Sequence, residues 1–532
     1  MDLNHLADFL SMLEDDGELV RISQRVETEL ELAAIADRIL KETPPPAGAP
    51  AILFDDVAGH TIPVVVNLLG SERRLCRALR IGSFQDGAER IAGLIAPDVP
   101  EGWFEAIQLV PRIAQLTKIP TIEVKTGLCQ QVVKLGSDVD LFQLPIPRCW
   151  PEETGPTLTA AHLVTSHPVT GDRCVIPVTA EVQSSTTIVL HADSRSQLWP
   201  LVEAANEQQT VLSLALVLGG DPVLNFAVQA PLPRHVDPYV FAGFLRQDNL
   251  RLVRGRSVNV PLPATAEIVI EGHIDPTAEQ SPGHVIASRS GFYAEPQTLP
   301  VMSVTAVTHR ANPVFPQVIV SPPPMELDWL ERANERIFLP LIRLFVPEVC
   351  DIHWPASGAF RNLLFVSIRK QYAGQARRVM HALWSLERIP AAKFLVVVDE
   401  DVNVRSESDV WFHATAHAQP GRDTTLHDGP VPFTDHSTPT AGLGRCVGID
   451  GTRKSGEPGH PRIWPRQVVA SAETAEAVAA HLETFRQTQS PATAAPPAAS
   501  EAASSRDGVS SGDRKPHESP TAASPTMARP RQ

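Results

Sequence analysis

Two glutamates on one predicted strand are the first side chains whose spacing could support chemistry. Glu267 and Glu271 lie at the two ends of the β-branched run 268–270, and residues four apart on a strand point to the same face. General acid–base chemistry can use a pair of carboxyl groups placed in this way. An Asp-Pro pair ends the strand, and an irregular loop over 281–293 follows it.

Histidine and aspartate side chains elsewhere are candidate metal ligands. His413 and His417 have the i, i+4 spacing of two ligands on one helix, but no glutamate completes an HExxH pattern and adjacent aromatic residues favour packing. His191 ends a predicted strand, where a surface histidine is the alternative interpretation. Asp237 precedes Pro238 at a predicted helix start, which is also typical of an N-cap followed by proline at the first helical position.

Composition and charge exclude several classes of protein. The net charge of −15 over 532 residues argues against a nucleic-acid groove, which needs a clustered basic face. No apolar run reaches the ~20 residues of a membrane-spanning helix, and the acidic N-terminus is unlike a secretory signal. The six cysteines form no CxxC pair, so we expect reduced thiols in a cytoplasmic protein.

The first part of the chain predicts an α+β domain over residues 1–135. Apolar residues at helical spacing predict an amphipathic helix over 4–15, and a second one over 32–40 is closed by three prolines. Aliphatic and β-branched content predicts strands over 19–22, 51–54 and 64–68.

Short strands dominate the middle of the chain and predict a β-barrel-like domain over 136–310. The strands are expected at 163–165, 175–178, 187–190 and 211–217, with helices over 197–207 and 239–245. A strand over 301–308 follows the loop at 281–293.

Alternating helices and strands then predict an α/β carboxy-terminal domain over 311–486. Its expected elements are helices over 326–346 and 373–386 and strands over 363–368 and 394–398. From 487 to 532 large apolar residues vanish, and Ala, Pro and Ser predominate, so a disordered tail is predicted.

Several long blocks, in the same order, resemble the UbiD family of prenylated-flavin-dependent decarboxylases, which includes polyprenyl-4-hydroxybenzoate carboxy-lyase. The blocks are PVVVNLLG, PATAEIVIEG, RKQYAGQARRVM, KFLVVVDEDVNVRSESDVW and PTAGLGRCVGIDGTRK, and the resemblance covers roughly residues 3–470. It implies a flavin-reductase-like split β-barrel that holds prenylated FMN together with Mn²⁺. It also implies homo-oligomers formed through the carboxy-terminal domain.

The resemblance places the family's two loop acids at Gly283 and Ser288, and neither residue is an acid. In the family these acids act with an arginine from an earlier strand. Glu267 and Glu271 remain as weak substitutes, although the resemblance gives them a structural role outside the acid–arginine–acid set.

The strand that carries the family's arginine and metal-site amide is altered as well. The resemblance places the arginine at Ala180 and the amide at Val175, and moving the alignment by one residue gives Thr179 and Cys174. Neither choice restores either group. Apolar side chains would instead line a pocket for a flat or greasy ligand, namely Val175, Pro177, Ala180, Val285 and Ile286.

The implied metal site lacks its carboxylate. The resemblance places the family's glutamate ligand at Pro238, leaving Asp237 and His191 as weak substitutes. The segment around the family's histidine is shorter here, so its counterpart is either lost or replaced by a neighbour such as Arg195.

Two functional hypotheses follow. The first is a UbiD-type homologue that is non-catalytic or repurposed and acts with an active paralogue. The alternative is an active prenylated-FMN-dependent (de)carboxylase of an aromatic or polyprenyl-hydroxybenzoate acid, with its site residues relocated. Losing the acid, the cation and the metal ligand together favours the first, because one electrostatic partner of a transition state is typically worth about 3 kcal/mol or more.

Overall fold

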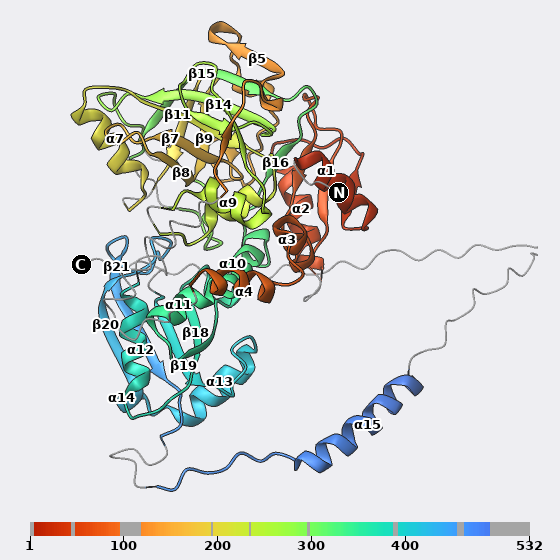
Figure 1. Ribbon diagram of the computed structural model, residues 1–532, viewed down its shortest axis with the longest axis vertical. Helices are drawn as coiled ribbons and strands as arrows, with labels where there is room; N and C mark the ends of the chain where they lie inside the picture. The colour runs from red at the N-terminus through yellow and green to blue at the C-terminus, as the bar shows by residue number, and fades with distance from the viewer. Residues whose placement is uncertain are drawn as a thin grey trace, which may run out of the picture. The chain divides into compact units, whose positions relative to one another are not determined.

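The computed structural model describes residues 5–43, 48–95, 119–192, 195–233, 236–282, 284–294, 298–386, 392–454 and 462–489. The chain forms two compact units, residues 1–464 and 465–532. In its described part, the second unit contains helix α15 (Ala472–Gln489). The predicted disordered tail over 487–532 lies outside the described residues from 490 onward. All other elements belong to the first unit (Figure 1).

The N-terminal region has the predicted α+β character. Its elements are α1 (Leu6–Asp15), β1 (Leu19–Ile22), α2 (Glu31–Glu42), β2 (Ala51–Phe54), β3 (Val64–Val66), α3 (Glu72–Leu79) and α4 (Phe84–Ile95). A later strand, β16 (Phe315–Gln317), completes a sheet of order β1-β2-β3-β16. The apolar stripe of α1 is buried as its spacing predicted, through Leu6, Phe9, Leu10 and Leu13.

A nine-stranded antiparallel sheet, curled into a half-barrel, forms the middle of the unit. Its strands are β5 (Val132–Leu135), β6 (Thr157–Leu158), β7 (His162–Ser166), β8 (Arg173–Pro177), β9 (Thr179–Ser184), β10 (Thr187–His191), β11 (Leu212–Leu218), β14 (Ile268–Ile274) and β15 (Val301–His309). Their order is β6-β9-β10-β15-β14-β11-β7-β8, and β5 pairs with β15.

Helices and a small sheet flank this half-barrel. The helices are α7 (Leu198–Glu207), α8 (Val223–Gln229) and α9 (Pro238–Arg246). The small sheet contains β4 (Ile122–Glu123), β12 (Arg251–Arg254) and β13 (Pro261–Pro263).

The register of β9 against β10 decides which side chains can meet. Thr179 pairs with His191, and Glu181 pairs with Val189 two residues along. Because side chains alternate between the two faces of a strand, Thr179, Glu181 and His191 lie on one face and Ala180 lies on the other.

The single helix predicted over 326–346 is two helices, α10 (Glu326–Ile337) and α11 (Leu339–Phe345). Pro340 lies in the first turn of α11, where it has no N–H to continue the hydrogen bonding of α10. The prediction of one helix was therefore wrong at this proline.

The carboxy-terminal region is a five-stranded sheet with helices on both faces (Figure 1). Its elements are β17 (Val349–His353), β18 (Leu363–Ile368), α12 (Gln375–Trp384), β19 (Phe394–Asp399), α13 (Glu407–His417), α14 (Pro420–Asp423), β20 (Thr424–Pro430) and β21 (Leu443–Asp450). The strand order is β17-β18-β19-β21-β20. Val397 packs with α12, whereas its neighbours Val396 and Val398 pack with α13.

Other global features agree with the composition. All six cysteines are free thiols. Within the described ranges, no helix combines the length and the apolar character that a membrane crossing requires.

Candidate functional site

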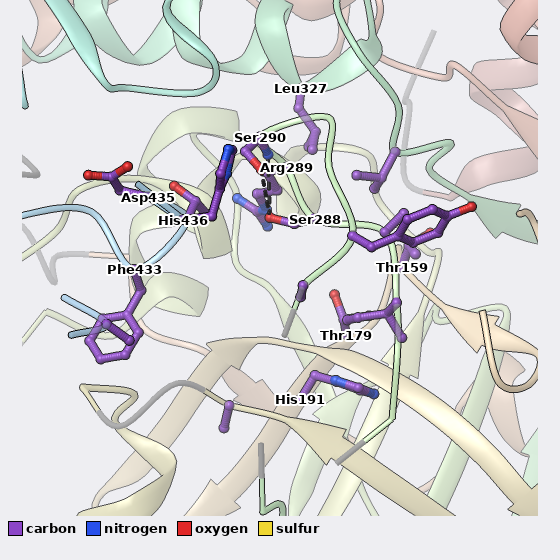
Figure 2. Close-up of a pocket in the computed structure, with 18 of the residues that line it drawn as sticks. Thr159, Thr179, His191, Ser288, Arg289, Ser290, Leu327, Phe433, Asp435 and His436 are labelled. Carbon is purple, nitrogen blue, oxygen red and sulfur yellow. Dashed lines mark hydrogen bonds between the residues drawn. The ribbon is translucent and has the colours of Figure 1, made fainter. Parts of the chain in front are cut away.

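Two cavities share part of their walls beside β9 and β10. The larger, about 920 Å³, is lined by β8 and by the segment that leads into α9. The smaller, about 470 Å³, lies between the half-barrel, residues 286–294 and residues 433–441. His191, Ala192 and Arg289 line both cavities. Figure 2 shows Thr179 and His191 on one side of the smaller cavity and Arg289 across from them.

The residues that the sequence predicted for one pocket do not all line the same cavity. Val175 and Pro177 line the larger cavity. Ala180 is fully buried in the apolar core and lines neither cavity, because it points to the face opposite Thr179. Thr179 is the residue of β9 that faces the smaller cavity. Ile286 lines that cavity too, whereas Gly283 lies outside the described residues.

Residues 286–294 form a hairpin that closes the smaller cavity. The amide of Ala294 donates to the carbonyl of Ile286 at 2.8 Å, and the amide of Ser288 donates to the carbonyl of Phe292 at 2.8 Å. Gly291 adopts a φ of +82°, and a Cβ there would lie 2.9 Å from Pro322 Cα. The turn therefore needs glycine at this position.

The base of the hairpin is held by a buried carboxylate. Glu153 Oε1 accepts a hydrogen bond from the amide of Ala287 at 3.1 Å, and Oε2 accepts from the amides of Cys149 and Trp150. Burial raises the pKa of Glu153, and these backbone donors oppose that rise. The carboxylate therefore fixes the hairpin to the loop that precedes β6.

Asp237, one of the two weak substitutes for a metal ligand, already has two partners within the chain. Its Oδ1 accepts a hydrogen bond from the amide of Tyr239 at 2.8 Å, so it caps α9 as the Asp-Pro sequence indicated. Its Oδ2 accepts from Arg173 Nε at 2.8 Å in a pair whose side chains are mostly buried. The Arg173 guanidinium also lies 5.3 Å from the ring centre of Tyr239. A cation of the chain itself thus neutralises this carboxylate.

His191 belongs to a cluster that the sequence did not predict. Glu181, only 1% exposed, lies between two imidazoles: His191 Nε2 is 3.3 Å from Oε2, and His284 Nδ1 is 2.7 Å from Oε1. Gln183 extends the cluster through a 3.0 Å contact with His284 Nε2. The sequence indicated only that Thr179 and Glu181, two residues apart, would lie on the same face of a strand. It could not place the partner His284, which lies 103 residues away from Glu181.

Arg289 is the second functional candidate that the sequence did not single out. It is half-buried at the tip of the hairpin, and its guanidinium lies 5.5 Å from the ring centre of Phe360. Burial lowers the pKa of Arg289, and the neighbouring Arg361 lowers it further, while Glu331 opposes both. Its position directly after Ser288, the second implied acid position, was the only sequence signal.

The two glutamates that opened the sequence analysis have structural partners and line neither cavity. Glu267 pairs with Arg310 at 2.8 Å and accepts from the amide of Val314. Glu271 is fully buried, and its carboxylate accepts four hydrogen bonds from residues 256–258.

The histidines of α13 do not form a metal centre with their neighbours. His413 and His417 lie on the same helix with ring centres 5.3 Å apart, and His417 Nδ1 contacts the carbonyl of Gly451. Across the described ranges, no three His, Cys, Asp or Glu side chains are grouped as metal ligands.

Comparisons with known proteins agree with this architecture. Family models of 3-octaprenyl-4-hydroxybenzoate carboxy-lyase (UbiD) match the N-terminal domain over residues 10–92, the Rift-related domain over 121–323 and the C-terminal domain over 328–451. An uncharacterised protein of Aquifex aeolicus is 36% identical over 472 residues, which cover 88% of this chain and 96% of the relative.

Solved structures share the fold. The UbiD-class enzyme HmfF from Pelotomaculum thermopropionicum, in complex with FMN, superposes with a TM-score of 0.72 at 27% identity, covering 88% of this chain and 98% of that one. An evolved dimeric form of HmfF was solved with prFMN (TM-score 0.71, 26% identity, 88% and 98% covered). Vanillic acid decarboxylase from Sedimentibacter hydroxybenzoicus gives a TM-score of 0.76 at 23% identity, covering 91% and 99%.

Proposed function

This chain belongs to the UbiD family of carboxy-lyases, and we propose that it is a non-catalytic or repurposed member that works beside an active paralogue. It retains a ligand cavity, but the acid, arginine and metal-ligand positions implied by the family resemblance hold Ser288, Thr179 or Ala180, and Pro238. We further propose a cytoplasmic homo-oligomer assembled through the carboxy-terminal region.

The Arg173–Asp237 ion pair carries this proposal. Divalent metals such as Mn²⁺ prefer carboxylate, imidazole or amide donors. Val175 and Pro238 provide no such donor, and Asp237 is already neutralised by Arg173. These residues do not fit a bound Mn²⁺, so no step of a reaction is assigned to a metal.

A flavin fits the residues better than a metal does. The larger cavity, about 920 Å³, lies within the ~300–1,000 Å³ range of ligand pockets. Val175, Ile176, Pro177 and Val228 give part of its wall an apolar surface that suits a flat ring, and polar and charged side chains line the rest. A bound prenylated flavin would supply an electron sink, and this chain's own residues would hold and orient it.

An active (de)carboxylase of an aromatic acid is the second candidate, and the walls of the smaller cavity favour it. His191, backed by Glu181, presents an imidazole that can hold or donate a proton, and Arg289 presents a cation that can hold a carboxylate. His191 differs in type from the acids of the implied family set, whereas Arg289 differs from the implied arginine only in its place on the chain.

One preparation separates the two candidates. The full chain is produced together with an enzyme that makes prenylated FMN, and the purified protein is measured for visible absorbance, bound manganese and CO₂ release from a panel of aromatic acids. We expect substoichiometric manganese and no CO₂ release, with or without a flavin spectrum. Stoichiometric manganese together with CO₂ release would refute the non-catalytic assignment.

A further inference from the structure

We propose that Arg289 anchors an oxyanion, the carboxylate or phosphate of a flat and largely apolar ligand, in the cavities that it lines. The inference deepens the proposed function, on which it rests only for the use of the same cavities. It assigns the ligand-binding cation to the hairpin at 286–294 rather than to β9.

The hairpin presents Arg289 in a fixed position. The amide of Gly291 donates to the carbonyl of Ser288 at 2.9 Å, and the hydroxyl of Ser290 donates to the Ser288 hydroxyl at 3.3 Å. Arg289 therefore stands at the tip of a closed turn, in the wall of both cavities. Figure 2 shows it in the smaller one. A preorganised guanidinium binds an oxyanion with less loss of conformational entropy than a mobile one.

Arg289 forms no direct ion pair among the described residues, whereas its neighbour Arg361 forms one. Arg361 stacks on the same Phe360 ring at 5.3 Å, and its guanidinium donates two hydrogen bonds to Glu331, at 2.6 and 2.7 Å. Among the described residues, the Arg289 guanidinium contacts the Phe360 ring and forms no hydrogen bond or ion pair with a carboxylate, although Glu331, which binds Arg361, acts on it at longer range. An unpaired, partly buried cation is costly, and a bound anion would remove that cost.

Two carboxylates near the smaller cavity already have partners within the chain. Asp435 lines it but is paired with Lys393 at 3.1 Å, and its Oδ1 also accepts from the amide of Ser437. Glu181 is held between the imidazoles of His191 and His284. Neither carboxylate forms an ion pair with Arg289, so an anionic ligand would complement this cation.

The other side chains that line the smaller cavity indicate which kind of ligand would fit it. Apolar side chains surround the smaller cavity, namely Ile286, Leu299, Val318, Val320, Leu327 and Phe433. A few hydroxyls, including those of Thr159 and Thr179, are interspersed among them. This combination suits an aromatic ring that carries a single acidic group. Because Arg289 also lines the larger cavity, the phosphate of a flavin is the other source of the oxyanion.

The test compares ligands that differ only in the anion. Binding is measured by isothermal titration calorimetry for FMN against riboflavin, and for 4-hydroxybenzoate against 4-hydroxybenzamide. The unaltered protein should prefer the anionic member of at least one pair by about 10-fold or more. The pair that shows the preference identifies the source, a flavin phosphate or an aryl carboxylate.

Three variants assign the preference to its residue. Arg289→Gln should abolish it, and Arg289→Lys should keep only part of it because an ammonium lacks the bidentate fork. Arg445→Gln, which removes an exposed arginine outside both cavities, is the matched control and should retain the full preference. The proposal is overturned by a preference that survives Arg289→Gln, or by the absence of a preference in both pairs.

The outcome is independent of the test for catalysis. Manganese and CO₂ release decide whether the protein is a decarboxylase, whereas anion preference decides what Arg289 does. A protein that releases CO₂ and keeps its anion preference in Arg289→Gln would refute both proposals. An inactive protein with an Arg289-dependent preference would support both.

Discussion

Replacing Asp237 with asparagine should destabilise the first compact unit substantially. Asparagine keeps an oxygen that can cap α9 through the amide of Tyr239. It removes the charge that neutralises Arg173, whose side chain is only 15% exposed. Asp237→Asn therefore isolates the ion pair from the helix cap, while Asp237→Ala removes both.

The magnitude follows from the burial of the pair. Breaking a buried ion pair by removing one partner typically costs about 3–5 kcal/mol, because the other charge stays buried. With Asp237 21% exposed, we expect about 2–4 kcal/mol for Asp237→Asn. Asp237→Ala should cost about 1 kcal/mol more through the lost cap. Adding Arg173→Met to Asp237→Asn should recover most of the loss, since no unpaired charge then remains.

Urea denaturation of the single and double variants measures this coupling. A change in the midpoint with an unchanged m-value reports stability alone. The matched control is Asp428→Asn, whose partner Arg445 forms an exposed pair, and we expect no measurable shift for it. An Asp237→Asn variant that behaves like this control would refute the reasoning, because Asp237 would then be free to bind something else.

Three further predictions concern buried acids and metal. Burial raises the pKa of Glu326 to about 7. Between pH values of about 4.5 and 7 the folded state therefore holds a proton that the unfolded state has lost, so the unfolding free energy should fall as pH rises through this range. Glu326→Gln should flatten that decline of about 3 kcal/mol, measured by urea midpoints across pH, and an unchanged slope would contradict it. Glu271→Gln should lower the free energy of unfolding by about 3 kcal/mol, because its new amide N–H groups would face the four donors at residues 256–258. Ligand affinity, measured by calorimetry, should stay unaltered. EDTA should leave the thermal midpoint unchanged, and a fall of several degrees would reveal a structural metal that the side chains do not indicate.

Elements with strong local patterns were predicted correctly. The apolar stripe of α1 and the strand β1 depend on spacing and residue type within a few positions, so the sequence was sufficient for them. Pro340 was a local signal that the long-helix prediction overlooked. The glycines at 444 and 448 belong to β21, where pairing with β19 and β20 overrides the weak strand preference of glycine.

For the candidate site, too, the sequence and the tertiary structure supplied different information. The sequence by itself determined which chemical groups are missing from the implied family positions, such as the carboxylate at Pro238, because residue identity needs no folding. Only the tertiary structure decided which side chains meet in and beside the cavities. Arg173 meets Asp237 across 64 residues, and Glu181 meets His284 across 103. Such contacts depend on strand register and on how separate elements pack, which no local pattern encodes.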